Sequence, residues 1–206
     1  GYDIGEVPVM PYSEAIARFG LDAPDLRFAM ELVDLDAALA GSAFAPVAKA
    51  KEEGGVLRGL CVKGAAEDAS RKVLDGWTDF VKRYGVGGLL WGKVDASGAV
   101  TGPLSKIEAD QLAATVAALG AEPGDVLLVG AGKPGAVHPG LGRLRVQIAK
   151  ERGLIPEGVF KFVWVVDFPL FEATPEGGWA PMHHPFTSPR PEHIEWLGTP
   201  RMGEIL

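Results

Sequence analysis

Residues 161–189 read KFVWVVDFPLFEATPEGGWAPMHHPFTSP, and this stretch decides how the rest of the chain is interpreted. Its apolar run, Phe162–Val166, consists of β-branched and aromatic residues, which is typical of a buried strand. The sequence Glu176–Gly178 favours a turn that sends the chain back as a second strand. We therefore expect a pair of strands here, followed by a loop stiffened by prolines.

Four ionisable side chains are expected beside each other in this stretch: Asp167, Glu172, His183 and His184. A neutral histidine accepts a hydrogen bond from an ammonium group, and a protonated one pairs with a carboxylate. Adjacent side chains of an extended segment point to opposite faces, so one histidine would face a small charged ligand and the other would support it. Without further information, adjacent histidines are more often structural or surface residues, and acids that end a strand are as often solvent-facing.

No metal site built by the protein is predicted. The opposite-face geometry argues against both histidines binding one ion, and the chain has no HExxH or paired-cysteine pattern. The single cysteine, Cys61, excludes an internal disulfide and is expected to be a small core residue.

Composition and charge are typical of a globular protein, with 206 residues of which 47% are hydrophobic and 23% charged. The sequence has no apolar run long enough for a membrane span and no signal-peptide pattern, so we expect a cytoplasmic protein. The first residue is glycine, which suggests a fragment or a processed chain. The net charge of −7 gives no indication of nucleic-acid binding.

The central hundred residues alternate between strand and helix patterns. Ser70 is a good N-cap for an amphipathic helix, and the glycines that follow each helical pattern are typical stop signals. The order β-α-β-β-α-β predicts a compact α+β module. The predicted segments are strands at Val56–Val62, Gly88–Val94, Val100–Ile107 and Asp125–Val129, and helices at Arg71–Tyr84 and Glu108–Leu119; a further helix is expected at Gly140–Arg152.

A GxGxxG pattern at Gly130, Gly132 and Gly135 invites a dinucleotide-binding interpretation, which we reject. That fingerprint needs a helix that opens at the glycines and holds a pyrophosphate at its N-terminus, within a parallel βαβ unit. Pro139 and Gly140 are expected to interrupt any helix that begins at Gly135. We therefore predict a glycine-rich turn.

Several long motifs in order resemble bacterial-type aspartyl-tRNA synthetases. Tyr12–Arg27 reads YSEAIARFGLDAPDLR, residues 70–94 read SRKVLDGWTDFVKRYGVGGLLWGKV, and residues 142–154 read GRLRVQIAKERGL. The segments WVVDFPLFE and MHHPFTSP complete the pattern. The resemblance implies an α+β fold: a GAD-type insertion module at residues 37–136, flanked by two pieces of a class II catalytic domain on an antiparallel sheet, at residues 1–36 and 137–206.

The resemblance also implies a function. The parent enzyme would activate aspartate with ATP and Mg²⁺ and transfer it to tRNA. This stretch alone is expected to be inactive and to bind no ATP, since the ATP-binding motifs of the family lie outside it. His183 and then His184 would lie against the aspartate substrate. For Asp167 and Glu172 the position at the end of the strand, and not the resemblance, favours a supporting role in which they orient a histidine or an arginine. Asp25 and Arg27 would form a structural salt bridge, and the full-length protein would be a cytoplasmic homodimer.

The main alternative is a non-catalytic tRNA-interaction module related to the B subunit of tRNA-dependent amidotransferases, which shares the GAD domain. The synthetase-type segments at both ends of the chain argue against it. The sequence leaves three matters open: whether the parent charges only the aspartate tRNA or also the asparagine tRNA, whether this chain dimerises, and what the insertion module does.

Overall fold

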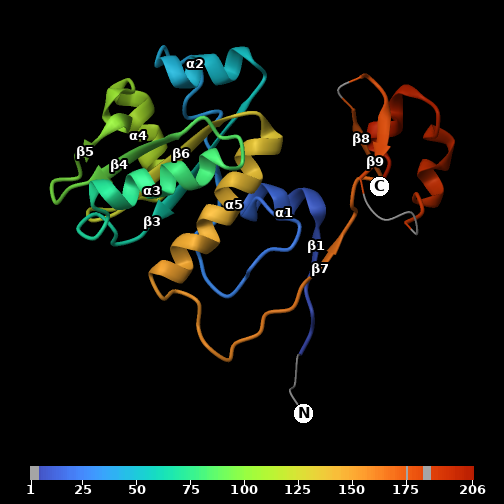
Figure 1. Cartoon of the computed structure of the whole chain (residues 1–206), viewed down its shortest axis with the longest axis horizontal. Helices are drawn as coiled ribbons and strands as arrows, with labels where there is room; N and C mark the ends of the chain where they lie inside the picture. The colour runs from blue at the N-terminus through green and yellow to red at the C-terminus, as the bar shows by residue number, and fades with distance from the viewer. Residues whose placement is uncertain (1–4, 175, 183–186) are drawn as a thin grey trace. The chain divides into compact units, whose positions relative to one another are not determined.

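The computed structural model describes residues 5–174, 176–182 and 187–206 (Figure 1). Contacts within the chain divide it into two compact units. We call residues 16–161 the sheet unit, and residues 1–15 together with 162–206 the hairpin unit. Helix α1 (Tyr12–Phe19) is divided between them. Each unit is described by itself.

The sheet unit is built on a five-stranded sheet in the order β2-β3-β6-β4-β5, in which every pairing is antiparallel (Figure 1). Its long strands pair in full register, with Leu57 opposite Ala131 and Val62 opposite Val126. The α+β class predicted from the sequence is confirmed. The strands are β2 (Val33–Asp34), β3 (Val56–Val62), β4 (Leu89–Val94), β5 (Val100–Thr101) and β6 (Val126–Gly132).

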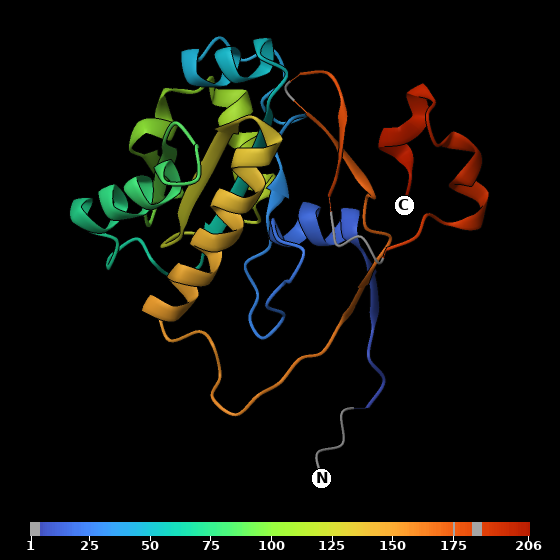
Figure 2. The same ribbon diagram turned by 45° about the vertical axis from the view of Figure 1, so that its right-hand side comes forward.

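Both faces of this sheet are buried, which explains why its central strand β6 is apolar almost throughout. Leu128 points into a cluster with residues of α3 (Arg71–Lys82) and α5 (Pro134–Glu151), which lie side by side over one face (Figure 2). Leu127 points into a second cluster on the opposite face. That face is covered by α2 (Ala45–Glu52), α4 (Ala109–Ala118) and the 3-10 turn η1 (Pro103–Lys106).

Helix α3 forms where the sequence predicts it. The Ser70 hydroxyl accepts a hydrogen bond from the Val73 N–H at 3.4 Å and caps the first turn. Leu74, Trp77 and Val81 bury one stripe of the helix, and the Trp77 indole donates to Glu151 of α5 at 2.9 Å. By contrast, the predicted strand Val100–Ile107 is wrong beyond Thr101, because Pro103 starts η1 there.

Helix α5 begins at Pro134, six residues before the predicted start at Gly140, and continues through Pro139. The prediction that Pro139 ends any helix from the glycine-rich segment is therefore wrong. A proline so close to the helix start removes one hydrogen bond. Burial of Val137, Leu141 and the following apolar residues against the sheet outweighs that loss. Because β6 has only antiparallel neighbours, β6 and α5 still do not form the parallel unit of a dinucleotide fold.

Arg145 of α5 anchors the loop that precedes β2. Its side chain is 1% exposed and donates to the carbonyls of Met30 at 2.6 Å, Asp25 at 2.9 Å and Phe28 at 3.0 Å. Burial lowers the pKa of the Arg145 guanidinium to about 10, so the group is still charged at neutral pH. In the same loop, Arg27 and Asp25 form the predicted salt bridge at 2.7 Å, which is confirmed.

The hairpin unit contains two short strand pairs. Strand β1 (Val9–Pro11) pairs in parallel with β7 (Trp164–Val166), and β8 (Phe171–Ala173) forms an antiparallel hairpin with β9 (Trp179–Pro181). The predicted turn at Glu176–Gly178 thus connects β8 to β9 and does not return the chain to β7. Two 3-10 segments, η2 (Pro191–Trp196) and η3 (Pro200–Glu204), follow.

The predicted strand over Phe162–Val166 forms at Trp164–Val166, but the prediction that it is buried is wrong. Phe162 precedes β7 and is 51% exposed, and Trp164 is 66% exposed. Apolar, β-branched composition predicts a strand but not what covers it. Within the described part of the hairpin unit, β7 has one strand neighbour and no covering layer over Trp164.

Candidate functional site

The structure describes two of the four predicted site residues. His183 and His184 lie outside the described residues, so their predicted contact with a ligand stays a prediction. Asp167 directly follows β7, and Glu172 lies in β8. Both acids belong to the hairpin unit.

Asp167 directly follows β7 and has an unusual backbone conformation. Its φ of 59° is in the left-handed region, which among residues other than glycine is adopted most readily by asparagine and aspartate. The strand ends here, and Phe168 then packs its ring on Tyr12 with centroids 5.1 Å apart. Asp167 therefore ends β7 in a backbone conformation that aspartate tolerates well.

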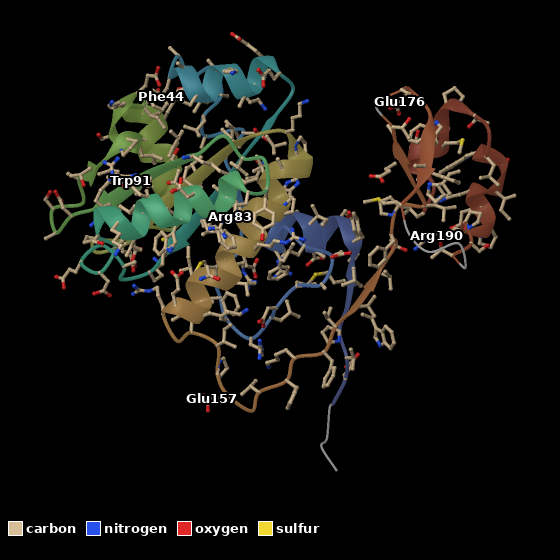
Figure 3. All side chains as sticks on the ribbon, viewed as in Figure 1. Phe44, Arg83, Trp91, Glu157, Glu176 and Arg190 are labelled. Atoms are coloured by element: carbon tan, nitrogen blue, oxygen red, sulfur yellow. The ribbon has the colours of Figure 1, made fainter. Side chains whose placement is uncertain are left out.

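The partner of this carboxylate is Arg190, whose guanidinium donates to Asp167 Oδ1. Arg190 (labelled in Figure 3) directly follows the MHHPFTSP segment, so the ion pair joins the end of β7 to the end of that segment. The Arg190 side chain is 45% exposed and that of Asp167 28% exposed. A second carboxylate, Glu192, lies 3.7 Å from the other side of the guanidinium.

A cavity of about 430 Å³ lies beside this ion pair. Its volume is within the range of small-molecule sites. The cavity is lined by residues 167–170, which follow β7, by residues 187–191 and by Leu206. The described lining residues are Asp167, Phe168, Pro169, Leu170, Thr187, Ser188, Pro189, Arg190, Pro191 and Leu206.

Met182 and Arg190, the residues on either side of residues 183–189, are hydrogen-bonded through their backbones to residues that line this cavity. Before the segment, the Met182 N–H donates to the Leu170 carbonyl at 2.9 Å. After it, the Arg190 N–H donates to the Leu206 carbonyl at 2.9 Å. The Leu206 N–H in turn donates to Nδ1 of the buried His193 at 3.1 Å, which fixes the tautomer of that ring as protonated on Nε2.

Glu172 is placed differently from Asp167. It is exposed on the β8–β9 hairpin opposite Ala180, and no described residue donates a hydrogen bond to its carboxylate. The structure thus brings Asp167, and not Glu172, into the lining of the cavity.

Sequence reasoning missed Arg190, although a signal was present. Asp167 ends a strand and needs a cation, and Arg190 is the only lysine or arginine between residues 162 and 200. Local sequence patterns do not pair residues this far apart. Arg190 could have been found only by noting that no other lysine or arginine lies between residues 162 and 200.

Elsewhere, a cavity of about 570 Å³ in the sheet unit lies between α2, the start of α5 and the loop before β4. Lys49, Glu53 and Lys133 are the charged residues in its lining. Among the described residues, no group of three or more histidine, cysteine, aspartate or glutamate side chains has metal-binding geometry. No helix in the described ranges has the length and apolar character to span a bilayer.

The partly buried Cys61 and the buried Asp125 form a small polar group in the sheet unit. The Cys61 thiol donates to Asp125 at 3.4 Å, and burial together with that carboxylate raises the pKa of the thiol to about 12. Such a thiol is not a nucleophile at neutral pH. This agrees with the structural role predicted for Cys61.

Comparison with known proteins gives the two units a family context. Residues 47–139 match the GAD domain. The chain is 46% identical over 194 residues to the aspartate–tRNA(Asp/Asn) ligase of Halothermothrix orenii, covering 93% of this chain and 32% of that protein. It is 44% identical over 193 residues to the aspartate–tRNA ligase of Enterococcus faecalis, covering 93% of this chain and 33% of the relative. The aspartate–tRNA(Asp/Asn) ligase of Bacillus subtilis is 43% identical over 195 residues, covering 94% of this chain and 33% of its own length.

These matches extend well beyond the GAD domain and include residues of both units, because they cover more than nine tenths of the chain. The chain spans about a third of the length of the curated relatives it matches. Residues 47–139 thus match the GAD domain, and they lie within a longer region that is similar to about one third of each of these aspartate–tRNA ligases.

Proposed function

We propose that this chain is part of an aspartate–tRNA ligase, an enzyme that joins aspartate to tRNA after activating it with ATP. The observation that carries the proposal is identity of 42–46% to such ligases, extending along nearly the whole chain. The GAD match alone would be weaker support, because it covers only residues 47–139. The 206 residues by themselves are proposed to be inactive, since they span a third of the relatives.

Within this proposal, the hairpin unit supplies part of the aspartate site. His183 and His184 contact the substrate, His183 first, and Asp167 supports the site from behind, whereas Glu172 lies outside the described lining of the cavity and is given no part in it. The support is the cavity beside Asp167, whose lining includes Thr187 and Ser188 immediately after the histidine segment. A histidine there is suited to a substrate that offers an ammonium group and two carboxylates.

ATP and Mg²⁺ belong to the proposed parent enzyme. The described residues do not match what those groups require, because they contain no carboxylate cluster of metal-binding geometry. The arginine at the described cavity is already engaged by Asp167. We therefore assign no step of ATP chemistry to this chain and restrict its role to the amino-acid substrate.

The remaining assignments follow from the same proposal. Residues 37–136 form a non-catalytic insertion domain, flanked by catalytic-domain pieces at residues 1–36 and 137–206. The full-length ligase is a cytoplasmic homodimer whose partners are aspartate, ATP and tRNA. Relatives named for tRNA(Asp) and for tRNA(Asp/Asn) occur at similar identity, so both tRNAs belong in the functional test.

The test measures aspartate-dependent exchange of pyrophosphate into ATP by the full-length protein, and then charging of both tRNAs. We expect exchange with aspartate and none with asparagine. Replacing His183 or His184 by alanine should lower kcat/KM for aspartate by at least about tenfold, equivalent to 1.4 kcal/mol. A full-length protein that shows no aspartate-dependent exchange would overturn the proposed function.

The competing function is a non-catalytic tRNA-interaction protein that keeps the GAD domain. Its support is the GAD match, and similarity outside residues 47–139 weighs against it. An antibody raised against this chain distinguishes the two by the mass of the native protein. A species roughly three times the 21.7 kDa of this chain favours the ligase, and a species of 21.7 kDa favours the tRNA-interaction protein.

A further inference from the structure

We propose that the cavity of about 570 Å³ in the sheet unit is a binding site for a small phosphate ester, whose phosphate is held by Lys133 and by the N–H groups of Gly87 and Gly88. This inference goes beyond the proposed function, because it concerns the sheet unit alone and adds nothing to the amino-acid site. All residues that line the cavity belong to the sheet unit and are described by the structure.

The sheet topology brings three segments of the chain together at the end of β6. Val56, the first residue of β3, pairs with Gly132, and Leu89, the first residue of β4, pairs with Gly130. The end of β6 is therefore flanked by α2, which ends shortly before β3, and by the loop that leads into β4. Helix α5 begins immediately after Lys133. Both ribbon views show α2 and the start of α5 at the same end of the sheet (Figure 1; Figure 2).

The loop before β4 supplies backbone donors to the cavity through Gly87 and Gly88. Neither residue has a positive φ, and a Cβ would meet nothing within 4 Å at Gly87 and only a Thr78 methyl group, at 3.9 Å, at Gly88. The fold therefore has room for a side chain at both positions. No described residue accepts a hydrogen bond from either N–H. Because glycine allows a ligand to approach the backbone closely, both N–H groups are available to an anion.

The charged side chains of the cavity favour an anion as well. Two lysines, Lys49 and Lys133, and one carboxylate, Glu53, lie in its lining, which leaves an excess of positive charge. Glu53 contacts Lys49 at 4.0 Å, whereas the Lys133 ammonium has no partner among the described residues. A lysine ammonium offers three donors to phosphate oxygens. Lys133 is therefore the side chain best suited to pair with a phosphate.

The rest of the lining indicates that the ligand is larger than a free anion. Its volume is within the range of small-molecule sites. An inorganic anion gains nothing from an apolar wall, whereas the body of a phosphate ester buries apolar surface there. The parallel unit that a dinucleotide requires is absent from this sheet, so the expected ligand is a small ester. The apolar lining residues are Pro46, Ala50, Leu89, Leu90, Ala131 and Ala136.

The experiment titrates the isotope-labelled 206-residue chain with phenyl phosphate and follows its backbone amide signals by NMR. We expect the signals of Gly87, Gly88 and Lys133 to move. Phenyl phosphate should bind at least about tenfold more tightly than inorganic phosphate, which lacks the apolar body, and than benzyl alcohol, which lacks the charge. Benzoate should also bind more weakly, because a carboxylate has less charge and fewer acceptor oxygens than a phosphate.

Three variants test the assigned side chains. Lys133→Gln should weaken the binding of phenyl phosphate at least about tenfold, because it removes a charged donor. Lys106→Gln is the matched control: it removes the same charge from an exposed position outside the cavity lining and should bind like wild type. Glu53→Gln should tighten binding, since it removes the negative charge from the lining. All three positions are exposed, so Tm should stay close to that of wild type.

Several results would overturn the inference. These are unmoved signals of Gly87, Gly88 and Lys133 in phenyl phosphate, equally tight binding of benzoate or benzyl alcohol, and equal weakening by Lys133→Gln and Lys106→Gln. Weaker binding in Glu53→Gln would overturn it too. The measurement uses no ligase activity, so a failure of the proposed function would leave its outcome unchanged.

Discussion

Arg145 offers the sharpest test of how the sheet unit is held together. We consider its replacement by methionine, which keeps a long flexible stem between the rings of Phe19 and Phe28 but removes every donor. The guanidinium carbon lies 4.9 Å from the Phe19 ring centroid and 4.1 Å from that of Phe28. Loss of stability in this variant therefore reports the hydrogen bonds more than the packing.

The expected magnitude follows from three carbonyl oxygens that lose their donor, those of Asp25, Phe28 and Met30. A buried acceptor left without a partner costs about 1–3 kcal/mol. These residues are only partly buried, so water reaches the loop in the variant and the lower end applies. Release of the guanidinium from its buried site offsets part of the loss. We expect a net destabilisation of about 2 kcal/mol, or about 4–8 °C in Tm for a domain of this size.

The assay is chemical and thermal unfolding of the 206-residue chain, followed by tryptophan fluorescence and circular dichroism. Arg143→Met is the matched control, because Arg143 lies two positions earlier on α5 but is exposed. We expect the control to change stability by less than about 0.5 kcal/mol. Arg145→Lys should be as damaging as Arg145→Met, since a compact ammonium cannot reach three carbonyls in the plane of a guanidinium. A Met variant within 1 kcal/mol of wild type would refute the anchoring role of Arg145.

Three further outcomes are expected. Gly102→Ala should cost at least about 3 kcal/mol and Gly98→Ala about 1, because both have positive φ but only a Cβ at Gly102 meets the Trp91 ring, at 2.2 Å; equal losses in urea unfolding would contradict this. Cys61, whose pKa is raised to about 12 by burial, should react with iodoacetamide at pH 8 only after unfolding, and labelling of the native protein at the rate of a free thiol would contradict this. Asp125 is buried, which by itself raises its pKa, but the N–H groups of Gly64 and Glu122 and the Lys63 ammonium outweigh this and lower it below 3.8. Its stabilisation is therefore complete above pH 3.8 and is lost as the pH falls through the lowered value, so the Tm difference between wild type and Asp125→Asn should be constant from pH 5 to 8 and shrink below about pH 3.8.

The elements of the sheet unit could be predicted because their patterns are local and strong. Ser70 marks the start of α3, and Leu74, Trp77 and Val81 recur at helical spacing. The strands Val56–Val62 and Leu89–Val94 match their predicted ranges to within a residue. Pro139 misled the prediction of α5, because its local cost was weighed without the apolar surface that the helix buries on the sheet.

The candidate site was predictable only in part. Asp167 was identified from its position after a strand, and the structure adds that it lines a cavity and holds a left-handed conformation. Glu172 was grouped with it on the same grounds, yet the hairpin places its side chain in solvent. Arg190 was missed, since the contact that makes it important joins residues far apart in the sequence.

By itself, the sequence determined the α+β class, the order of helices and strands in the sheet unit, and the motifs that point to an aspartate–tRNA ligase. These depend on interactions between residues a few positions apart, which periodicity and capping record directly. Only the tertiary structure decided that Trp164 is exposed, that α5 runs through Pro139, and that Arg190 is the partner of Asp167. Burial and pairing of this kind depend on which distant surfaces meet, and no local pattern encodes that.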